Sequence, residues 1–234
     1  MRNTSSSRAL CVAAVAILCV LAFSGCEKQS PVSPESDTIL GSQTTAGVPL
    51  AVGNTWVYKR TSLDSSGAIV NTGITTTEIV RACTLGTQQW FVARTTEGGT
   101  SSETLLANIN GAHYYRFLND TVSLLYLQFP SGASRSFAMD EHFPGWPGHP
   151  DTILHVPCTV SSLPGIVRVP MGRFFAYKYT APDTNVTYSG MTIHIGAWEM
   201  YLSDIGEVEL ISYSKTSKGQ YVSGILELLE DTIR

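Results

Sequence analysis

Four side chains that could bind a metal ion lie close together in the sequence. They are His142, His149, Asp151 and His155. A metal site needs ligands that converge on one point, and the spacing of these four matches no metal-binding motif. Three prolines and two glycines fall between residues 140 and 151. We therefore expect a long irregular loop over about 140–165 whose histidines face water, with no metal site and no cofactor.

Candidate catalytic groups are scattered along the chain. The sequence has no Gly-x-Ser-x-Gly, no His-Glu-x-x-His and no phosphate-binding glycine loop, so no residue is predicted to be catalytic. Glu207 and Glu209 alternate along one expected strand, which would place both on one face, and we expect that face to point to water. The leading interpretation is a non-enzymatic protein. The alternative is an enzyme, or an accessory subunit of one, that acts through the 140–165 loop.

The charge balance argues against one class of partner. Beyond residue 25 the chain carries 13 basic and 19 acidic residues, and the basic residues form no cluster. Nucleic-acid binding needs a basic patch, so nucleic acid is not an expected partner.

The five cysteines fall into two groups. Cys11 and Cys19 lie in an apolar N-terminal run that Cys26 follows, whereas Cys83 and Cys158 lie far along the chain. In an oxidising compartment Cys83 and Cys158 could form one disulfide. The alternative is two buried free thiols, and the choice depends on whether their Cα atoms come within bridging distance.

Residues 1–25 have the parts of a secretory signal peptide. Arg2 and Arg8 give a positive start, and an unbroken apolar run of 15 residues follows from Ala9 to Phe23. A helix that spans a bilayer needs roughly 20 apolar residues. The run is therefore short for the alternative, a permanent N-terminal anchor helix.

The end of this run, Phe23-Ser24-Gly25-Cys26, resembles the lipobox of bacterial lipoproteins, although Phe23 stands where leucine is commonest. The resemblance implies cleavage between Gly25 and Cys26, and acyl chains on Cys26 that attach the protein to a membrane of the cell envelope. Glu27 is not the aspartate associated with inner-membrane retention. The resemblance therefore favours the periplasmic face of the outer membrane or the cell surface.

Two further segments follow the signal peptide. Residues 26–46 begin with Cys26, and the rest of this segment is polar and contains prolines, so we expect a flexible tether. Residues 47–234 have the length of one domain. Short runs of β-branched and aromatic residues, separated by Gly, Asn, Asp and Pro, predict that this domain is all-β and mainly antiparallel with little helix.

Two stretches indicate how the strands are arranged. Asn110-Gly111 is the strongest hairpin signal in the chain. Val122–Phe129 is apolar on both faces, which is typical of a strand covered on both sides or of a closed or curled sheet. We expect a single curled sheet or half-barrel, or a sandwich-like arrangement. Leu226–Glu230, near the end, could be a strand or a short helix.

Three short patterns resemble a widespread family of uncharacterised bacterial lipoproteins and periplasmic proteins. They are PLAVGNTWVY at 49–58, VPMGRF at 169–174 and SDIGEV at 203–208. The resemblance implies a fold similar to the curled antiparallel sheet of the periplasmic lipoprotein carrier and its outer-membrane receptor.

The concave face of a curled sheet receives every second side chain. We expect Trp56, Tyr58, Leu125 and Leu127 to line either a site for an apolar ligand or simply the packed core. The predicted function is therefore a binding or structural module of the cell envelope. It would hold an apolar ligand or a partner protein.

Overall fold

The computed structural model describes residues 38–40, 42, 47–143, 151–188, 191–217 and 219–233. All of them belong to one compact unit, Ser36–Arg234. Every element of regular structure in this part of the chain is a β-strand, so the all-β prediction is confirmed. None of the described residues forms a helix that is long and apolar enough to cross a membrane.

The first half of the domain is an antiparallel meander in which each strand pairs with the next. Its strands are β2 (Thr55–Leu63), β3 (Ile69–Leu85), β4 (Gln88–Glu97), β5 (Thr100–Ile109), β6 (Ala112–Phe117) and β7 (Leu124–Gln128). Asn110 and Gly111 join β5 to β6 with φ angles of 50° and 77°. These left-handed conformations suit a tight hairpin, as the sequence predicts.

The second half adds further strands to the same sheet. They are β8 (Arg135–Phe143), β9 (Thr152–Val160), β10 (Gly165–Val169), β11 (Gly172–Ala181), β14 (Trp198–Ser203), β15 (Gly206–Thr216) and β16 (Gly219–Thr232). The strand order is β7-β6-β5-β4-β3-β2-β16-β15-β14-β11-β9-β8, so the pairing of β2 with β16 joins the two halves. Leu226–Glu230 lies within β16, which decides for the strand over the helix at this end.

Three short elements flank this sheet. β1 (Ile39–Leu40) pairs in parallel with β11, and β10 pairs with the same part of β11 in antiparallel orientation. β12 (Thr184–Tyr188) and β13 (Met191–Ile195) form a separate hairpin.

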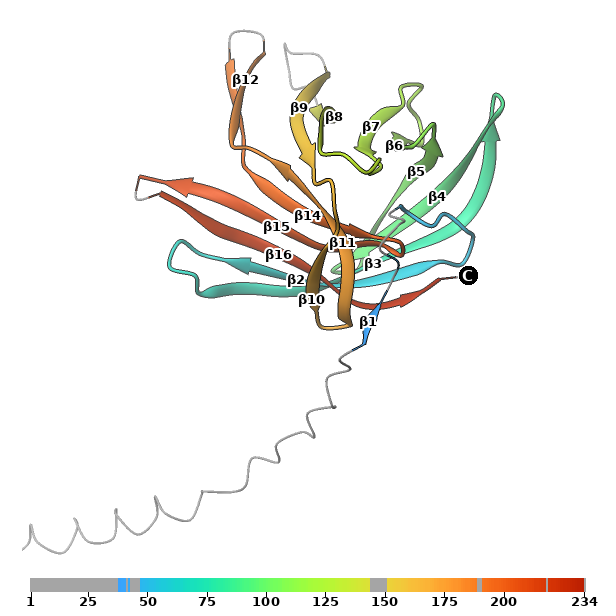
Figure 1. The fold of residues 1–234 in the computed structure, drawn as a ribbon. Coiled ribbons are helices and arrows are strands. Elements are labelled where there is room, and N and C mark those ends of the chain that lie inside the picture. Colours follow the sequence, from blue (N-terminus) through green and yellow to red (C-terminus); the bar gives the residue numbers. More distant parts are fainter. Residues whose placement is uncertain are drawn as a thin grey trace, which may run out of the picture. The chain divides into compact units, whose positions relative to one another are not determined.

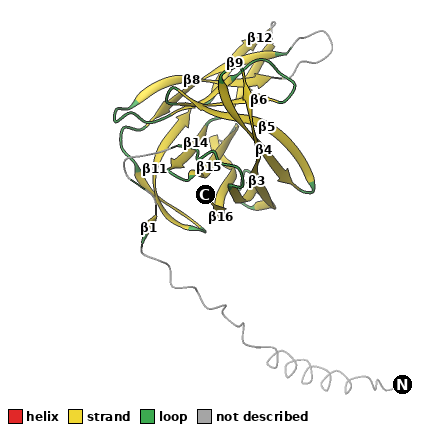
Figure 2. Ribbon diagram, turned by 90° about the vertical axis from the view of Figure 1, so that its right-hand side faces the viewer, coloured by secondary structure: helices red, strands yellow, loops and turns green. Residues whose placement is uncertain are grey.

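The sheet curls until its two end strands, β7 and β8, lie beside each other (Figures 1 and 2). Side chains link the two ends. The Leu125 N–H on β7 donates a 2.9 Å hydrogen bond to Asp140 Oδ2 on β8. The Tyr115 hydroxyl on β6 donates to the Asp140 carbonyl oxygen at 3.1 Å. The domain is thus the curled antiparallel sheet, or half-barrel, that the sequence predicts.

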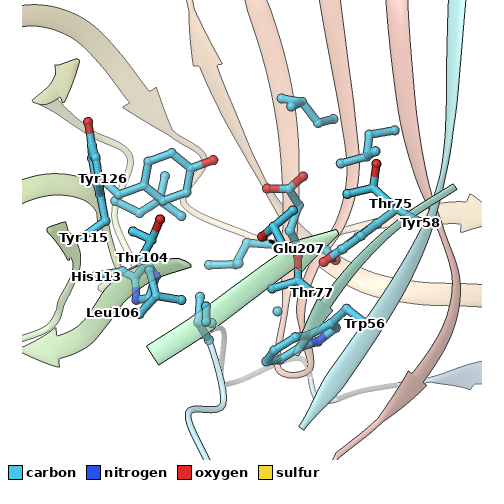
Figure 3. Close-up of a pocket in the computed structure, with 18 of the residues that line it drawn as sticks. Trp56, Tyr58, Thr75, Thr77, Thr104, Leu106, His113, Tyr115, Tyr126 and Glu207 are labelled. Carbon is cyan, nitrogen blue, oxygen red and sulfur yellow. Dashed lines mark hydrogen bonds between the residues drawn. The ribbon is translucent and has the colours of Figure 1, made fainter. Parts of the chain in front are cut away.

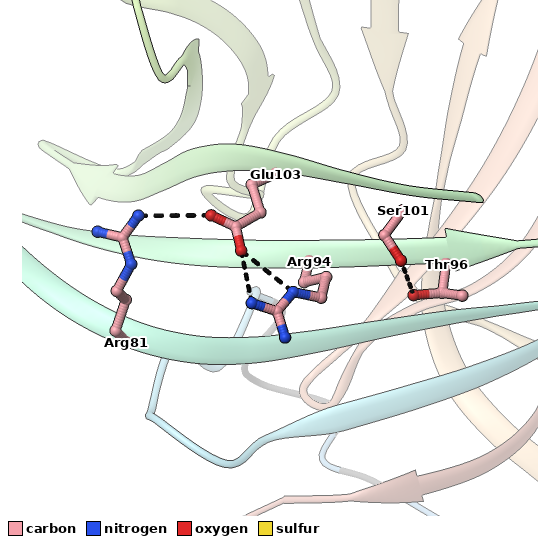
Figure 4. Close-up of polar contacts among 5 residues, drawn as sticks. All are labelled: Arg81, Arg94, Thr96, Ser101 and Glu103. Atoms are coloured by element: carbon pink, nitrogen blue, oxygen red, sulfur yellow. Dashed lines mark hydrogen bonds and ion pairs between the residues drawn. The ribbon is translucent and has the colours of Figure 1, made fainter. Parts of the chain in front are cut away.

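Polar pairs stabilise one face of β3, β4 and β5 (Figure 4). Glu103 accepts hydrogen bonds from Arg94 Nη2 at 2.7 Å and from Arg81 Nη2 at 3.4 Å, and the Arg94 bond is the main cause of the lowered pKa of Glu103. The Thr96 and Ser101 hydroxyls lie 2.8 Å apart on the same two strands, β4 and β5. Side chains alternate along a strand, so residues next to these pairs face the interior of the curl.

The three patterns in the sequence meet in one hydrophobic cluster. Trp56, Phe174 and Val208, one from each pattern, are all buried and belong to the same cluster. Residues more than 100 positions apart therefore form one core between β2, β11 and β15. These patterns build the scaffold of the domain.

The predicted irregular loop over 140–165 is wrong in extent. β8 continues to Phe143 and β9 begins at Thr152, so His142 and His155 lie on paired strands. The three prolines on which the loop prediction rested, at 144–150, lie outside the described residues.

Pro157 made β9 hard to predict because proline cannot donate to a strand ladder. It is tolerated here because β9 pairs with β11 only at Thr159 and Val160, so the residue at 157 has no ladder partner on that side.

Cys83 on β3 and Cys158 on β9 are free thiols. Cys158 is buried beside Phe137 and Tyr179, whereas Cys83 is half-buried in a different cluster, beside Trp90. The structure therefore has free thiols where the sequence left a disulfide open, because the fold places the two cysteines in separate clusters. Burial raises the pKa of the Cys158 thiol to about 11, so that thiol stays protonated near neutral pH.

Candidate functional site

The interior of the curled sheet contains a cavity of about 570 Å³ (Figure 3). This volume falls in the roughly 300–1,000 Å³ range of small-molecule sites. Strands β2 to β8 supply one part of the wall, and β14, β15 and β16 supply the rest. The cavity thus lies between the two halves of the sheet.

The largest part of the wall is apolar. Its buried and half-buried apolar members are Val48, Trp56, Ala93, Leu106, Leu127, Leu202, Leu210 and Leu226. Trp56 is 3% exposed and Leu127 1% exposed, so these side chains turn away from bulk solvent and toward the interior. Such a surface favours an apolar ligand.

Threonine hydroxyls from β3, β4 and β5 add a polar strip to the wall. The four residues are Thr75, Thr77, Thr95 and Thr104. Thr77 Oγ1 and Thr95 Oγ1 lie 3.1 Å apart and share a hydrogen bond. Thr75 Oγ1 is buried and has no hydrogen-bond partner among the described residues. Buried hydroxyls are usually paired, so the Thr75 hydroxyl is an unsatisfied polar group in this wall.

Glu207 enters the cavity from the start of β15, and two residues of β2 hold its backbone in place. Trp56 Nε1 donates a 2.7 Å hydrogen bond to the Ile205 carbonyl oxygen. The Tyr58 hydroxyl donates a 3.1 Å hydrogen bond to the carbonyl oxygen of Glu207. Gly206 has a φ of 110°, and a Cβ there would come within 3.3 Å of Trp56 Nε1. Only glycine suits both the backbone and the close approach at this position.

The Glu207 side chain is half-buried and borders the cavity, where Tyr126 is its side-chain hydrogen-bond partner. Burial raises its pKa to about 7, and a hydrogen bond with Tyr126 offsets only part of that rise. No lysine or arginine occurs among the described residues that line the cavity. A half-buried carboxyl group without a basic partner, with a perturbed pKa, is typical of a functional site.

The expectation that Glu207 and Glu209 share a solvent face is wrong. Glu207 pairs with Leu202 and Glu209 with Tyr201, with a bulge between these two pairs. A bulge inserts one residue and so reverses the alternation of side chains. Glu207 therefore lines the cavity with Leu202, whereas Glu209 lies on the other face with Tyr201.

A chain of ring contacts runs along the cavity to its mouth. Ring centroids are 6.1 Å apart for His113 and Tyr126, 6.2 Å for Tyr126 and Tyr115, 5.8 Å for Tyr115 and Phe117, and 5.0 Å for Phe117 and His142. All four contacts are edge-to-face. His113 is 3% exposed and Phe117 39% exposed, so this row of ring contacts links the buried end of the cavity to solvent.

His113 is neutral at this buried end. Asn108 Nδ2 donates to the Val48 carbonyl oxygen, so Asn108 Oδ1 is turned toward His113 Nδ1, 2.8 Å away. Because Oδ1 can only accept, Nδ1 carries the proton and Nε2 is left as an acceptor. Burial lowers the pKa of His113 to about 4.

The residues predicted from the sequence to line a ligand site divide into two groups. Trp56, Tyr58 and Leu127 lie on the cavity wall, but Leu125 does not. Leu125 packs against the hydrophobic cluster that contains Leu127 and residues of β8, β9 and β11, but it does not reach the cavity wall. Gly25 and Cys26, the predicted cleavage and lipid-attachment residues, lie outside the described residues.

The metal-capable side chains form pairs. His142 Nε2 lies 3.3 Å from Asp151 Oδ2, and His155 Nδ1 lies 2.8 Å from Asp140 Oδ1. His149 lies outside the described residues. Within the described part of the chain, no three His, Cys, Asp or Glu side chains are grouped so that they could hold a metal ion.

Two solved structures resemble this fold. One is a protein of Bacteroides fragilis, described as exported and as having a YmcC-like fold; it is 13% identical, with a TM-score of 0.47, and the match covers 79% of this chain and 98% of that chain. The other is a protein of Parabacteroides distasonis, described as a lipoprotein; it is 14% identical, with a TM-score of 0.46, and the match covers 79% of this chain and 97% of that chain. No protein-family model and no curated protein matches the chain.

Proposed function

We propose that this protein is a non-enzymatic binding module of the bacterial cell envelope that holds an apolar ligand inside its curled sheet. The observation that carries this proposal is the cavity of about 570 Å³ with a mainly apolar wall. Apolar side chains that face water in such an open site are unfavourably hydrated, and an apolar ligand that covers them would remove that cost.

The position of the cavity favours a small ligand over a partner protein. Its wall comes from the inward faces of strands in both halves of the sheet, and Trp56, Leu127 and Leu202 are buried there. A partner protein would need a broad outer surface, whereas an apolar chain needs only a path past Phe117, which is 39% exposed at the edge of the cavity. The signal peptide and the lipobox-like Cys26 support the envelope location.

Titration with N-phenyl-1-naphthylamine tests the proposal, because this neutral dye becomes fluorescent in apolar surroundings. The chain from Glu27 onward, which contains the whole compact unit Ser36–Arg234, should bind the dye saturably. Thr104→Phe places a ring in the cavity and should remove most of the binding. Ser101→Phe is the matched control, because Ser101 is exposed on the opposite face of β5, where its hydroxyl lies 2.8 Å from that of Thr96. No saturable binding, or equal binding by both variants, would refute the proposal.

A further inference from the structure

The cavity wall is acidic as well as apolar. Glu207 borders its interior and Glu141 lies at its exposed edge, and the described lining residues include no lysine or arginine. Arg60, which lines an adjoining pocket, is paired with Glu97 at 2.5 Å. A bound anion would therefore meet like charge without a basic partner, which disfavours fatty acids and phosphate-bearing lipids.

Aromatic rings surround the same carboxyl group. Tyr58 on β2 and Tyr126 on β7 approach Glu207 from opposite sides of the cavity, as Figure 3 shows. Tyr115 contacts Tyr126 edge-to-face and continues the aromatic wall toward the mouth. Ring faces attract ammonium groups, and aromatic cages are a common way to bind them. A carboxylate within such a cage adds the opposite charge.

Further hydrogen-bond acceptors lie on the same wall. The Thr75 hydroxyl is buried without a partner among the described residues. His113 Nε2 is an acceptor because Nδ1 carries the proton. An ammonium group can only donate, so His113 Nε2, which can only accept, matches it and would not match a carboxylate or phosphate head group; the Thr75 hydroxyl can donate or accept and suits either.

We propose that the ligand is an amphiphile with an aliphatic chain and an ammonium head group, and that Glu207 binds that head group. This inference rests on the proposed function and specifies its ligand class. The aliphatic chain lies against Leu106, Leu127 and Leu226, and the head group lies among Glu207, Tyr58 and Tyr126. An alcohol of the same chain length binds more weakly because it lacks the charge, and a fatty acid binds most weakly because it repels the carboxylate.

Competition against N-phenyl-1-naphthylamine tests the predicted order of affinity, in which the amine binds more tightly than the alcohol and the alcohol more tightly than the fatty acid. Dodecylamine, dodecanol and dodecanoic acid, each below the concentration at which it aggregates or separates from water, are titrated into the dye-bound chain at about pH 8, where Glu207 is ionised. Dodecylamine should displace the dye at a concentration about tenfold or more below that of dodecanoic acid. Glu207→Gln should remove the advantage of the amine over the alcohol, while Glu209→Gln, on the opposite face of β15, should keep it.

The outcomes separate this inference from the proposed function. If neither the dye nor any of the three compounds binds, the proposed function is wrong. If the dye binds but dodecanoic acid competes as well as dodecylamine, the cavity binds apolar ligands and the ammonium inference is wrong. The inference also fails if Glu207→Gln keeps the preference for the amine. Circular dichroism of both glutamine variants verifies that each remains folded.

Discussion

Tyr58 donates a 3.1 Å hydrogen bond from its hydroxyl group to the carbonyl oxygen of Glu207, which lies 149 positions later in the chain. Trp56, on the same face of β2, donates to the Ile205 carbonyl oxygen at 2.7 Å. The strand that opens the domain therefore holds the turn that carries the cavity's carboxyl group. The pattern at 49–58 and the pattern at 203–208 act as one structural unit.

Tyr58→Phe tests this relationship. The variant removes one hydrogen bond in a buried setting and should lower the free energy of unfolding by about 1 kcal/mol. Tyr114→Phe is the control, because Tyr114 is half-buried on β6 and lies outside the cavity wall. Urea unfolding measures both variants. Equal stability of Tyr58→Phe and the unmodified chain would contradict the assigned role of the hydroxyl group.

Glu207→Gln should stabilise the protein in a pH-dependent way. Burial raises the pKa of Glu207 from 4.5 to about 7, so the folded protein binds its proton more tightly than the unfolded chain. Stability is therefore lost as pH rises from about 4.5 to about 7, by up to roughly 3 kcal/mol. The glutamine variant should avoid this loss and be more stable near pH 8, with little difference near pH 4.

The other titratable side chains near Glu207 do not change the predicted pH dependence of Glu207→Gln. Tyr58 and Tyr126 have pKa values raised well above 10 by burial, and His113 is neutral above about pH 4. Glu141 lies at the exposed edge of the cavity. It is present in both the unmodified chain and the Glu207→Gln variant, so its titration contributes equally to the stability of each. Thermal unfolding across this pH range measures the effect, with Glu78→Gln on the exposed face of β3 as the control. A stability difference that does not change with pH would count against a buried carboxyl group.

His113 should destabilise the fold in acid. Its pKa is lowered from 6.5 to about 4 by burial, so the unfolded chain takes up the proton first. The stability that the fold has with His113 neutral is fully present above about pH 6.5 and is lost as pH falls toward 4. Heteronuclear NMR of the imidazole ring should show titration only near pH 4. Titration near 6.5 would mean that His113 is exposed to water.

Asp140→Ala should loosen the junction between the two ends of the sheet. The variant removes the acceptor of the 2.9 Å hydrogen bond from the Leu125 N–H. Hydrogen exchange at Leu125 should become faster, while exchange in the paired strands β2 and β3 stays unchanged. Asp64→Ala is the control, because Asp64 accepts a 2.8 Å bond from the Ser66 N–H in a distant hairpin. Unchanged exchange at Leu125 would show that the junction does not depend on Asp140.

Cys26→Ser tests the attachment to the membrane. If acyl chains on Cys26 hold the protein, the variant should move from the membrane fraction to the soluble fraction of the envelope. A variant that remains in the membrane fraction as fully as the unmodified protein would contradict the lipobox interpretation.

Local patterns were enough to predict most of the fold. Alternation along β2 predicted that Trp56 and Tyr58 share a face, and both lie on the cavity wall. Asn110-Gly111 predicted a hairpin, and the structure has it between β5 and β6. These features depend on neighbours in the chain, so a single sequence carries them.

The features that the sequence did not predict depend on distant contacts. Glu207 turns inward because of a bulge in its pairing with β14, and the sequence has no local signal for that bulge. The aromatic chain from His113 to His142 forms only when β6, β7 and β8 come together. The extent of β8 and β9 was hidden by prolines at 144–150 and by Pro157.

Native mass spectrometry of the protein released from its own cell envelope tests the central claim most directly. The account predicts a protein mass that carries an apolar adduct. Extraction with organic solvent should remove this adduct and leave the cavity free to bind the dye. Thr104→Phe should lose the adduct, and Ser101→Phe, on the opposite face of β5, should retain it. A mass without any adduct, together with no dye binding by the same preparation, would contradict the claim that the curled sheet holds an apolar ligand.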